Sequence, residues 1–233
     1  MKSSISIRLA SLSLFATTLL FASCDLLLKT TNNSQNPTTP STDAAVEAGI
    51  CPDTRHPHAI DLGLGTLWAC CNTGASVPWD LGGWYAWGET SSKTNFVYST
   101  YIHSTSGGYT NLGDDIGGGQ YDAATKVMGR RWRMPSQSQM EQLVSCEQFW
   151  TELAGVYGAG FKGPSGKVIF LPAAGYGRNE SLSSQGQRGC YWTSTQSPYG
   201  NPSAFYMDFR QSGYANLKYE NRCEGRSIRA VAQ

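Results

Sequence analysis

Histidines and cysteines are the side chains of this 233-residue chain best suited to catalysis or metal binding. The three histidines, His56, His58 and His103, have no recognisable catalytic spacing. The chain contains no G-x-S-x-G, H-E-x-x-H or C-x-x-C motif. A serine hydrolase, a zinc protease, a zinc ribbon and a thioredoxin-like protein therefore have no support. We therefore expect a protein that is not an enzyme and that carries no metal and no cofactor.

The first 24 residues have the pattern of a secretory signal peptide. Lys2 and Arg8 lead into an apolar run over residues 9–22, and Ser23 and Cys24 follow. The run is shorter than the ~20 residues of a membrane-spanning helix. Its end resembles a bacterial lipobox, which implies cleavage before Cys24 and lipidation of that cysteine. The alternative is an ordinary signal peptide with an incidental cysteine. We expect an outer-membrane lipoprotein that faces the periplasm or the cell surface.

Six further cysteines follow Cys24. An even number of cysteines in an exported chain indicates disulfides, although the sequence does not define their pairing. Cys70 and Cys71 are adjacent in a strand-like segment, so their side chains should point to opposite faces and need different partners, or one is a buried thiol. The six are Cys51, Cys70, Cys71, Cys146, Cys190 and Cys223.

The charge balance argues against nucleic acid as a partner. Removal of residues 1–23 leaves 18 − 2 = 16 basic side chains against 17 acidic ones, a net charge of −1. Such a chain has no basic surplus with which to bind nucleic acid or an acidic membrane, so membrane contact should come only from the lipid. The 26 glycines, 12 tyrosines and 7 tryptophans indicate a loop-rich domain with aromatic anchors.

The segments that must position any site belong to one domain. Residues 24–50 are predicted to be a flexible tether and residues 51–233 the folded part. Hydrophobic spacing predicts an α+β domain with short strands and long glycine-rich connections. We expect helices over residues 121–128 and 136–147, and strands over residues 59–64, 67–69, 168–171, 191–195, 204–209 and 227–231.

Seven motifs follow one another along the chain. They are His58-Ala-Ile-Asp-Leu-Gly-Leu64, Leu67-Trp-Ala-Cys-Cys-Asn-Thr-Gly-Ala75, Tyr85-Ala-Trp-Gly-Glu-Thr90, Trp132-Arg-Met-Pro-Ser136, Phe170-Leu-Pro-Ala-Ala-Gly-Tyr176, Tyr191-Trp-Thr-Ser-Thr195 and Ser227-Ile-Arg-Ala-Val231. This ordered set resembles the Fibrobacter succinogenes major paralogous domain family, found on exported lipoproteins of Bacteroidetes and related bacteria. The resemblance covers about residues 57–232 and implies a C-type-lectin-like fold with two helices, short antiparallel sheets and long loops.

The resemblance also bears on one cysteine pair. In lectin-like folds a cysteine before the Tyr-Trp strand often pairs with one before the last strand, which implies a Cys190–Cys223 disulfide. Formylglycine-generating enzymes share the fold and use a reactive cysteine pair, so such an enzyme is the less favoured alternative.

Two further residue sets have structural interpretations. The Glu-Pro-Asn and Trp-Asn-Asp triplets of calcium-dependent lectins are absent, and Asp114-Asp115 is interpreted as a pair of solvated acids. Four motif tryptophans are expected in the core: Trp68, Trp87, Trp132 and Trp192.

The candidate recognition surface lies near the C-terminus. Alternation over residues 204–210 predicts that Phe205, Met207 and Phe209 face inward. The intervening side chains and those of residues 213–221 are rich in tyrosine, asparagine and basic groups, as binding surfaces are. We therefore expect a membrane-anchored module that binds an extracellular glycan or protein; the alternative is a structural component of the cell surface without its own ligand. The predicted contact residues are Tyr206, Asp208, Arg210, Tyr214, Asn216, Lys218, Tyr219 and Asn221.

Overall fold

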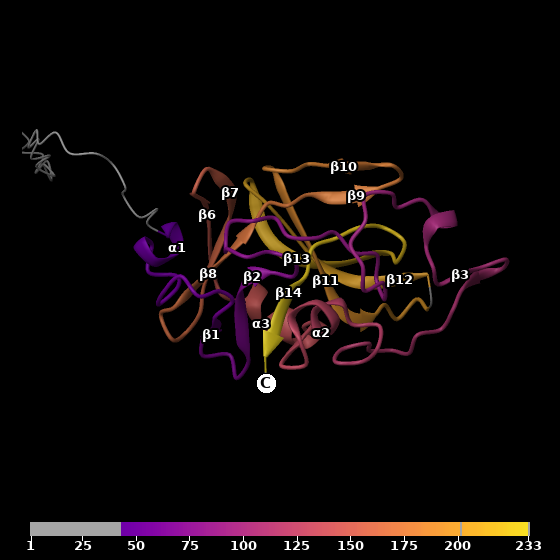
Figure 1. The fold of residues 1–233 in the computed structure, drawn as a ribbon, viewed down its shortest axis with the longest axis horizontal. Helices are drawn as coiled ribbons and strands as arrows, with labels where there is room; N and C mark the ends of the chain where they lie inside the picture. The colour runs from indigo at the N-terminus through magenta and orange to yellow at the C-terminus, as the bar shows by residue number, and fades with distance from the viewer. Residues whose placement is uncertain (1–42, 201, 233) are drawn as a thin grey trace, which may run out of the picture. The chain divides into compact units, whose positions relative to one another are not determined.

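The computed structural model describes residues 43–200 and 202–232 (Figure 1). The predicted signal peptide, Cys24 and residues 25–42 of the predicted tether lie outside this part. Residues 43–50, also assigned to the tether, include the short helix α1 (Ala44–Glu47), which Asp43 caps through its side chain. Ala45 of this helix is buried against the domain. Within the described ranges, no helix has the length and apolar character needed to cross a membrane.

The described chain is a mixed α+β domain of antiparallel sheets with few helices. One sheet has the order β1-β2-β14-β5, so a late strand pairs with early ones. Its strands are β1 (Ala59–Asp61), β2 (Leu67–Asn72), β5 (Trp132–Arg133) and β14 (Arg229–Ala232). β1 and β2 form an antiparallel hairpin in which Ile60 lies opposite Trp68, and β1 ends at Asp61 instead of at the predicted residue 64.

Two three-stranded antiparallel sheets complete the body of the domain. The first has the order β6-β7-β8 and the second the order β11-β12-β13. The first comprises β6 (Glu147–Leu153), β7 (Val156–Lys162) and β8 (Val168–Pro172), and the second comprises β11 (Arg188–Gln196), β12 (Ser203–Arg210) and β13 (Gly213–Asn221).

The two expected helices are present. Helix α2 (Ala123–Met128) is capped by Asp122, and helix α3 (Gln137–Val144) begins with a capping box in which Ser136 and Gln139 exchange hydrogen bonds. Helix α3 ends three residues before the predicted Glu147, which instead begins β6. The remaining short elements are η1 (Tyr98–Thr100), β3 (Ser104–Thr105), β4 (Gly108–Tyr109), β9 (Tyr176–Arg178) and β10 (Ser181–Ser183).

Aromatic side chains fill the core, as the motifs predict. Trp68, Trp87, Trp132 and Trp192 are all buried. The indole N–H of Trp87 donates to the Thr193 carbonyl at 2.9 Å, and that of Trp192 donates to the Tyr85 carbonyl at 2.8 Å. These bonds satisfy polar groups that would otherwise destabilise a buried ring.

A fully buried arginine links two of the sheets. The guanidinium of Arg229 on β14 donates to Asn72 Oδ1 and to the carbonyls of Ala69, Cys70 and Phe170, at 2.7–3.0 Å. Phe170 lies on β8, whereas the other three acceptors lie on β2. Arg229 therefore stabilises both the pairing of β14 with β2 and the contact of this sheet with β8.

Candidate functional site

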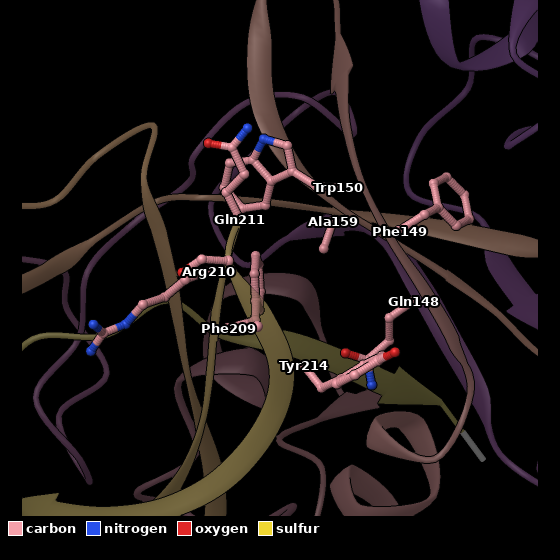
Figure 2. Close-up of a pocket in the computed structure, with 10 residues that line it drawn as sticks. Gln148, Phe149, Trp150, Ala159, Phe209, Arg210, Gln211 and Tyr214 are labelled. Atoms are coloured by element: carbon pink, nitrogen blue, oxygen red, sulfur yellow. The ribbon is translucent and has the colours of Figure 1, made fainter. Parts of the chain in front are cut away.

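The site begins with a hollow at the turn between β12 and β13, which we call the turn hollow (Figure 2). It has a volume of about 280 Å³ and is formed by β6, by Ala159 of β7 and by the turn itself. Its lining residues are Gln148, Phe149, Trp150, Ala159, Phe209, Arg210, Gln211, Ser212, Gly213 and Tyr214.

Phe209 is the buried part of the turn hollow. Its ring packs edge-on against Trp150 and Phe161, with ring centroids 6.4 and 5.8 Å apart, and stacks on Tyr191 at 5.9 Å. Gly189 lies opposite Phe209 in the β11–β12 pairing. A Cβ atom at Gly189 would come within 2.0 Å of the Phe209 ring, so only glycine leaves room for this ring. The aromatic base of the hollow is therefore fixed by core packing.

The Gln148 side chain links β6 to β13 through hydrogen bonds at the edge of the turn hollow. Gln148 Oε1 on β6 accepts a hydrogen bond from the Ala215 amide on β13 at 2.7 Å, and Gln148 Nε2 donates to the Val144 carbonyl. Tyr214, the residue before Ala215, is 84% exposed, the highest exposure of any large apolar or aromatic side chain among those described. The hollow thus combines a rigid base with a solvent-exposed tyrosine at its rim.

A second, more polar hollow lies on the other side of the same turn. It has a volume of about 480 Å³ and shares Arg210, Gln211 and Ser212 with the turn hollow. Figure 2 shows the Arg210 side chain extending away from Phe209. Arg188 also lines this second hollow, and its guanidinium lies over the Tyr176 ring at 5.1 Å. Residues 210–212 therefore separate an aromatic hollow from a basic, hydrogen-bonding one.

Asp208 does not form part of an exposed surface, contrary to the sequence prediction. Its side chain is buried and forms ion pairs with Arg188 and Lys218. Burial alone would raise the pKa of Asp208, but the hydrogen bonds from these two cations outweigh it and lower the pKa below its ordinary value of 3.8. Asp208 is thus a charged anchor that holds Arg188 and Lys218 in place.

The prediction that Tyr206 faces solvent is also wrong. Tyr206 is buried beside Trp192, with the two rings in edge-to-face contact at 5.9 Å. The buried Arg226 guanidinium lies 3.9 Å from the Tyr206 ring centroid and 4.3 Å from that of Trp192. A chain segment after β13 therefore covers the face of β12 that the alternation predicted to be open. Both faces of this strand are buried over most of its length.

The other predicted contact residues lie on two faces of β13. Asn216 is opposite Asp208 and Lys218 is opposite Tyr206, whereas Tyr219 is opposite Phe205. Asn216, Tyr219 and Asn221 are exposed and Lys218 is half-buried. Tyr219 packs against the 70%-exposed Tyr199, with ring centroids 4.9 Å apart.

The expected inward set is confirmed for Met207 and Phe209, which are buried, whereas Phe205 is only half-buried at its edge-on contact with Tyr219. The predicted surface is therefore not one continuous face. Tyr214 and Arg210 lie at the turn hollow, and Tyr219 lies away from it with Tyr199.

The implied Cys190–Cys223 disulfide is not formed in the structure, where both residues are free thiols. Cys190 is buried in the cluster around Trp192, whereas Cys223 is buried in a separate cluster around Phe96 and Tyr101. Burial raises the pKa of both thiols, that of Cys190 to about 11. Reactive cysteines need a lowered pKa, so these two lack the electrostatics of a nucleophile.

Sequence reasoning missed the β6 wall of the turn hollow. Phe149 and Trp150 follow a correctly predicted helix, and glycines interrupt the strand that pairs with them. The available signal was the Ala154-Gly155 pair between two aromatic-rich segments, which forms the tight turn of a hairpin with positive φ at both positions.

Comparison with known proteins gives one match, to a family model. No curated protein and no solved structure matches the chain. Residues 116–231 match the model of a family described as "Domain of unknown function (DUF8237)". This range extends from the loop before α2 into β14, and includes every residue of the turn hollow while leaving out β1 and β2.

Proposed function

We propose that this protein is an exported, membrane-anchored binding module that recognises an extracellular glycan at the turn between β12 and β13. The observation that carries the proposal is the turn hollow, where Trp150 and Tyr214 present aromatic surface above the buried Phe209 ring, beside the polar groups of Gln148 and Gln211. Small-molecule sites typically combine apolar walls with a few placed polar groups. Aromatic rings offer a flat apolar face to a sugar ring, and the amides can bond to its hydroxyls.

The size of the turn hollow limits the size of the ligand unit that can enter it. Its volume of about 280 Å³ is slightly below that of typical small-molecule pockets, which run from about 300 to 1,000 Å³. It suits one terminal unit of a larger ligand better than an extended chain. The neighbouring polar hollow, with Arg188 and Arg210, would receive an acidic or hydroxyl-rich second unit. The proposed ligand is therefore a glycan whose terminal residue enters the turn hollow.

The assignment of a C-type-lectin-like fold is part of the same proposal. The family resemblance implies a C-type-lectin-like fold, and the observed α+β architecture with antiparallel sheets and long loops is compatible with it. Such folds host many activities, so the site rather than the fold supports the binding function. The free, buried thiols of Cys190 and Cys223 give no support to a formylglycine-generating enzyme.

A Tyr214→Ala variant should lose glycan binding without losing stability. Removal of an aromatic anchor from a binding site typically costs more than ~1 kcal/mol, or roughly a fivefold loss of affinity. Because Tyr214 is 84% exposed, the free energy of unfolding should change by less than ~0.5 kcal/mol. The measurement is a glycan array with the purified domain, followed by titration calorimetry with the best ligand and by urea unfolding.

Tyr199→Ala is the matched control, because this exposed tyrosine lies in the other aromatic pair and not at the turn hollow. It should bind as the unsubstituted protein does. Loss of binding in Tyr199→Ala but not in Tyr214→Ala would place the site at the Tyr199–Tyr219 pair. A parallel array that gave protein ligands and no glycan would refute the glycan proposal.

The membrane anchor is proposed from the sequence, since Cys24 lies outside the described residues. In a bacterial host that incorporates labelled palmitate, a Cys24→Ser variant should lose the label and leave the membrane fraction. Cys146→Ser is the matched control and should retain both. Unchanged labelling of Cys24→Ser would exclude lipidation at this residue.

A further inference from the structure

A cluster of cysteine and histidine side chains lies far from the turn hollow in sequence. The sulfurs of Cys70 and Cys71 on β2 lie 3.5 Å apart, so the prediction that these side chains point to opposite faces is wrong. Cys70 Sγ also lies 3.3 Å from His56 Nδ1. The potential ligand atoms of His56, Cys70 and Cys71 all lie within 4.8 Å of one another. In a second group, which shares His56, the potential ligand atoms of Cys51, His56 and His58 also lie within 4.8 Å of one another. The segment before β1 thus brings further ligand types to the two cysteines of β2.

The distances in this cluster are close to those around a tetrahedral zinc ion. Zinc–sulfur and zinc–nitrogen bonds of about 2.3 and 2.0–2.1 Å separate two sulfurs by ~3.8 Å and a sulfur from a nitrogen by ~3.6 Å. The observed separations of 3.5 and 3.3 Å are each shorter by only ~0.3 Å. Small side-chain rotations would therefore open the space for an ion without moving the backbone.

The surroundings of His56 favour metal binding over a simple packing role. Its Nε2 atom lies 2.8 Å from Asp43 Oδ2, while Nδ1 points at the sulfur of Cys70. A carboxylate on the far nitrogen of a histidine is the usual outer partner of a zinc ligand, because it fixes the ring orientation and makes the nearer nitrogen a better donor. The His56 and Asp43 side chains are 1% and 7% exposed, so this arrangement is part of the interior.

A backbone donor also contacts the cluster. The His58 amide donates to Cys70 Sγ at 3.0 Å. An amide-to-sulfur hydrogen bond favours the thiolate form of the cysteine that a metal binds.

From this geometry we propose that Cys51, His56, Cys70 and Cys71 bind one zinc ion that fixes residues 43–58 to β2. Cys51 is the fourth ligand because it is buried, whereas the His58 side chain is 16% exposed and His58 Nε2 already lies 2.9 Å from the Asp53 carbonyl. Four protein ligands leave no open position, so the role is structural rather than catalytic. The proposal is independent of glycan binding, and it replaces the expectation that the protein holds no metal.

The competing arrangement is a disulfide. An exported protein with buried cysteines often has one, and Cys51, Cys70 and Cys71 are buried in the same cluster. However, a disulfide does not account for a histidine that is aimed at the sulfur and held from behind by a carboxylate. This difference makes the two alternatives separable by experiment.

The first measurement is the metal content and thiol state of the mature full-length chain. After incubation with zinc and desalting, we expect about one zinc ion per chain, slow reaction of Cys51, Cys70 and Cys71 with a thiol reagent, and fast reaction once a chelator is added. Addition of cobalt to the chelated protein should give the visible absorption of a tetrahedral site together with thiolate charge-transfer bands. A non-reduced peptide map that shows Cys51 joined to Cys70, or a protein that retains no zinc, would overturn the proposal.

Variants then test the ligand set. His56→Ala and Cys51→Ser should each lower zinc retention at least tenfold under chelator competition. The matched controls are His58→Ala, which keeps the backbone amide that contacts Cys70, and Cys146→Ser, whose cysteine lies outside the cluster. Both controls should retain zinc. If the ligand variants do not fold, the cobalt spectrum of the unsubstituted chain decides, because a spectrum without thiolate bands excludes cysteine ligation. Equal zinc retention in His56→Ala and His58→Ala would also refute the ligand set.

Discussion

Replacement of Arg229 by leucine should lower the free energy of unfolding by ~3–5 kcal/mol, as expected when one partner of a buried polar network is removed. The guanidinium is fully buried and donates to three backbone carbonyls and to Asn72. Leucine would leave these acceptors buried without partners, and each costs about 1–3 kcal/mol. A loss of this size is a large part of the 5–15 kcal/mol that typically stabilises a domain. Urea unfolding followed by circular dichroism measures it.

Two further arginine variants sharpen this prediction. Arg210→Leu removes an arginine whose side chain is 54% exposed, so it should change stability by less than ~0.5 kcal/mol. Arg229→Lys should remain strongly destabilised, since one ammonium group cannot reach the four acceptors that the planar guanidinium spans. A midpoint for Arg229→Leu equal to that of Arg210→Leu would show that the buried network contributes little.

Phe209→Ala should destabilise the domain by ~3–5 kcal/mol and abolish binding at the turn hollow. The ring is buried against Trp150, Phe161 and Tyr191, and its removal would leave a cavity under the hollow. Phe209→Leu keeps most of the volume and should cost less than ~1.5 kcal/mol. Thermal unfolding of both variants, with binding measured well below their melting temperatures, separates the two effects.

Substitutions at Phe209 and at Tyr214 are expected to have different effects on stability, so the two variants can be compared directly. Loss of Phe209 should reduce stability and binding together, whereas loss of Tyr214 should reduce binding alone. If Phe209→Ala unfolded at the same denaturant concentration as the unsubstituted protein, the ring could not be the packed base that the structure shows.

The sequence predicted those elements whose signals are local. Ser136 as an N-cap, followed by apolar residues at helical spacing, predicts a helix, and the apolar run at Val168 predicts a strand, because both signals depend on neighbouring residues. The β6–β7 hairpin was missed because β7 reads as a glycine-rich loop. The reason for these glycines is tertiary: a Cβ at Gly160 would come within 2.3 Å of the Phe149 ring on the paired strand. Nothing near Gly160 in the chain indicates this contact.

The candidate site shows the same division. The alternation of residues in β12 correctly predicted that Met207 and Phe209 are buried and that Arg210 is exposed. It could not show that the other face of the strand is covered as well. That cover comes from Arg226, 20 residues beyond Tyr206, whose charge is accommodated by two aromatic rings and by Glu224. Likewise, residues from Cys51 to Cys71 follow no familiar ligand spacing, and only the β1–β2 hairpin and the segment before it bring them together.

β14 is the last strand to be synthesised, but it lies in the middle of its sheet. This strand lies between β2 and β5, and its Arg229 bonds to Asn72, 157 positions earlier in the chain. Until the ribosome has released residues 229–232, β2 keeps one edge open, and Ala69, Cys70 and Asn72 lack their arginine. An open edge of this kind is a template for pairing with other chains. The sheet around β2 can therefore be completed only after residues 229–232 are available to pair with it.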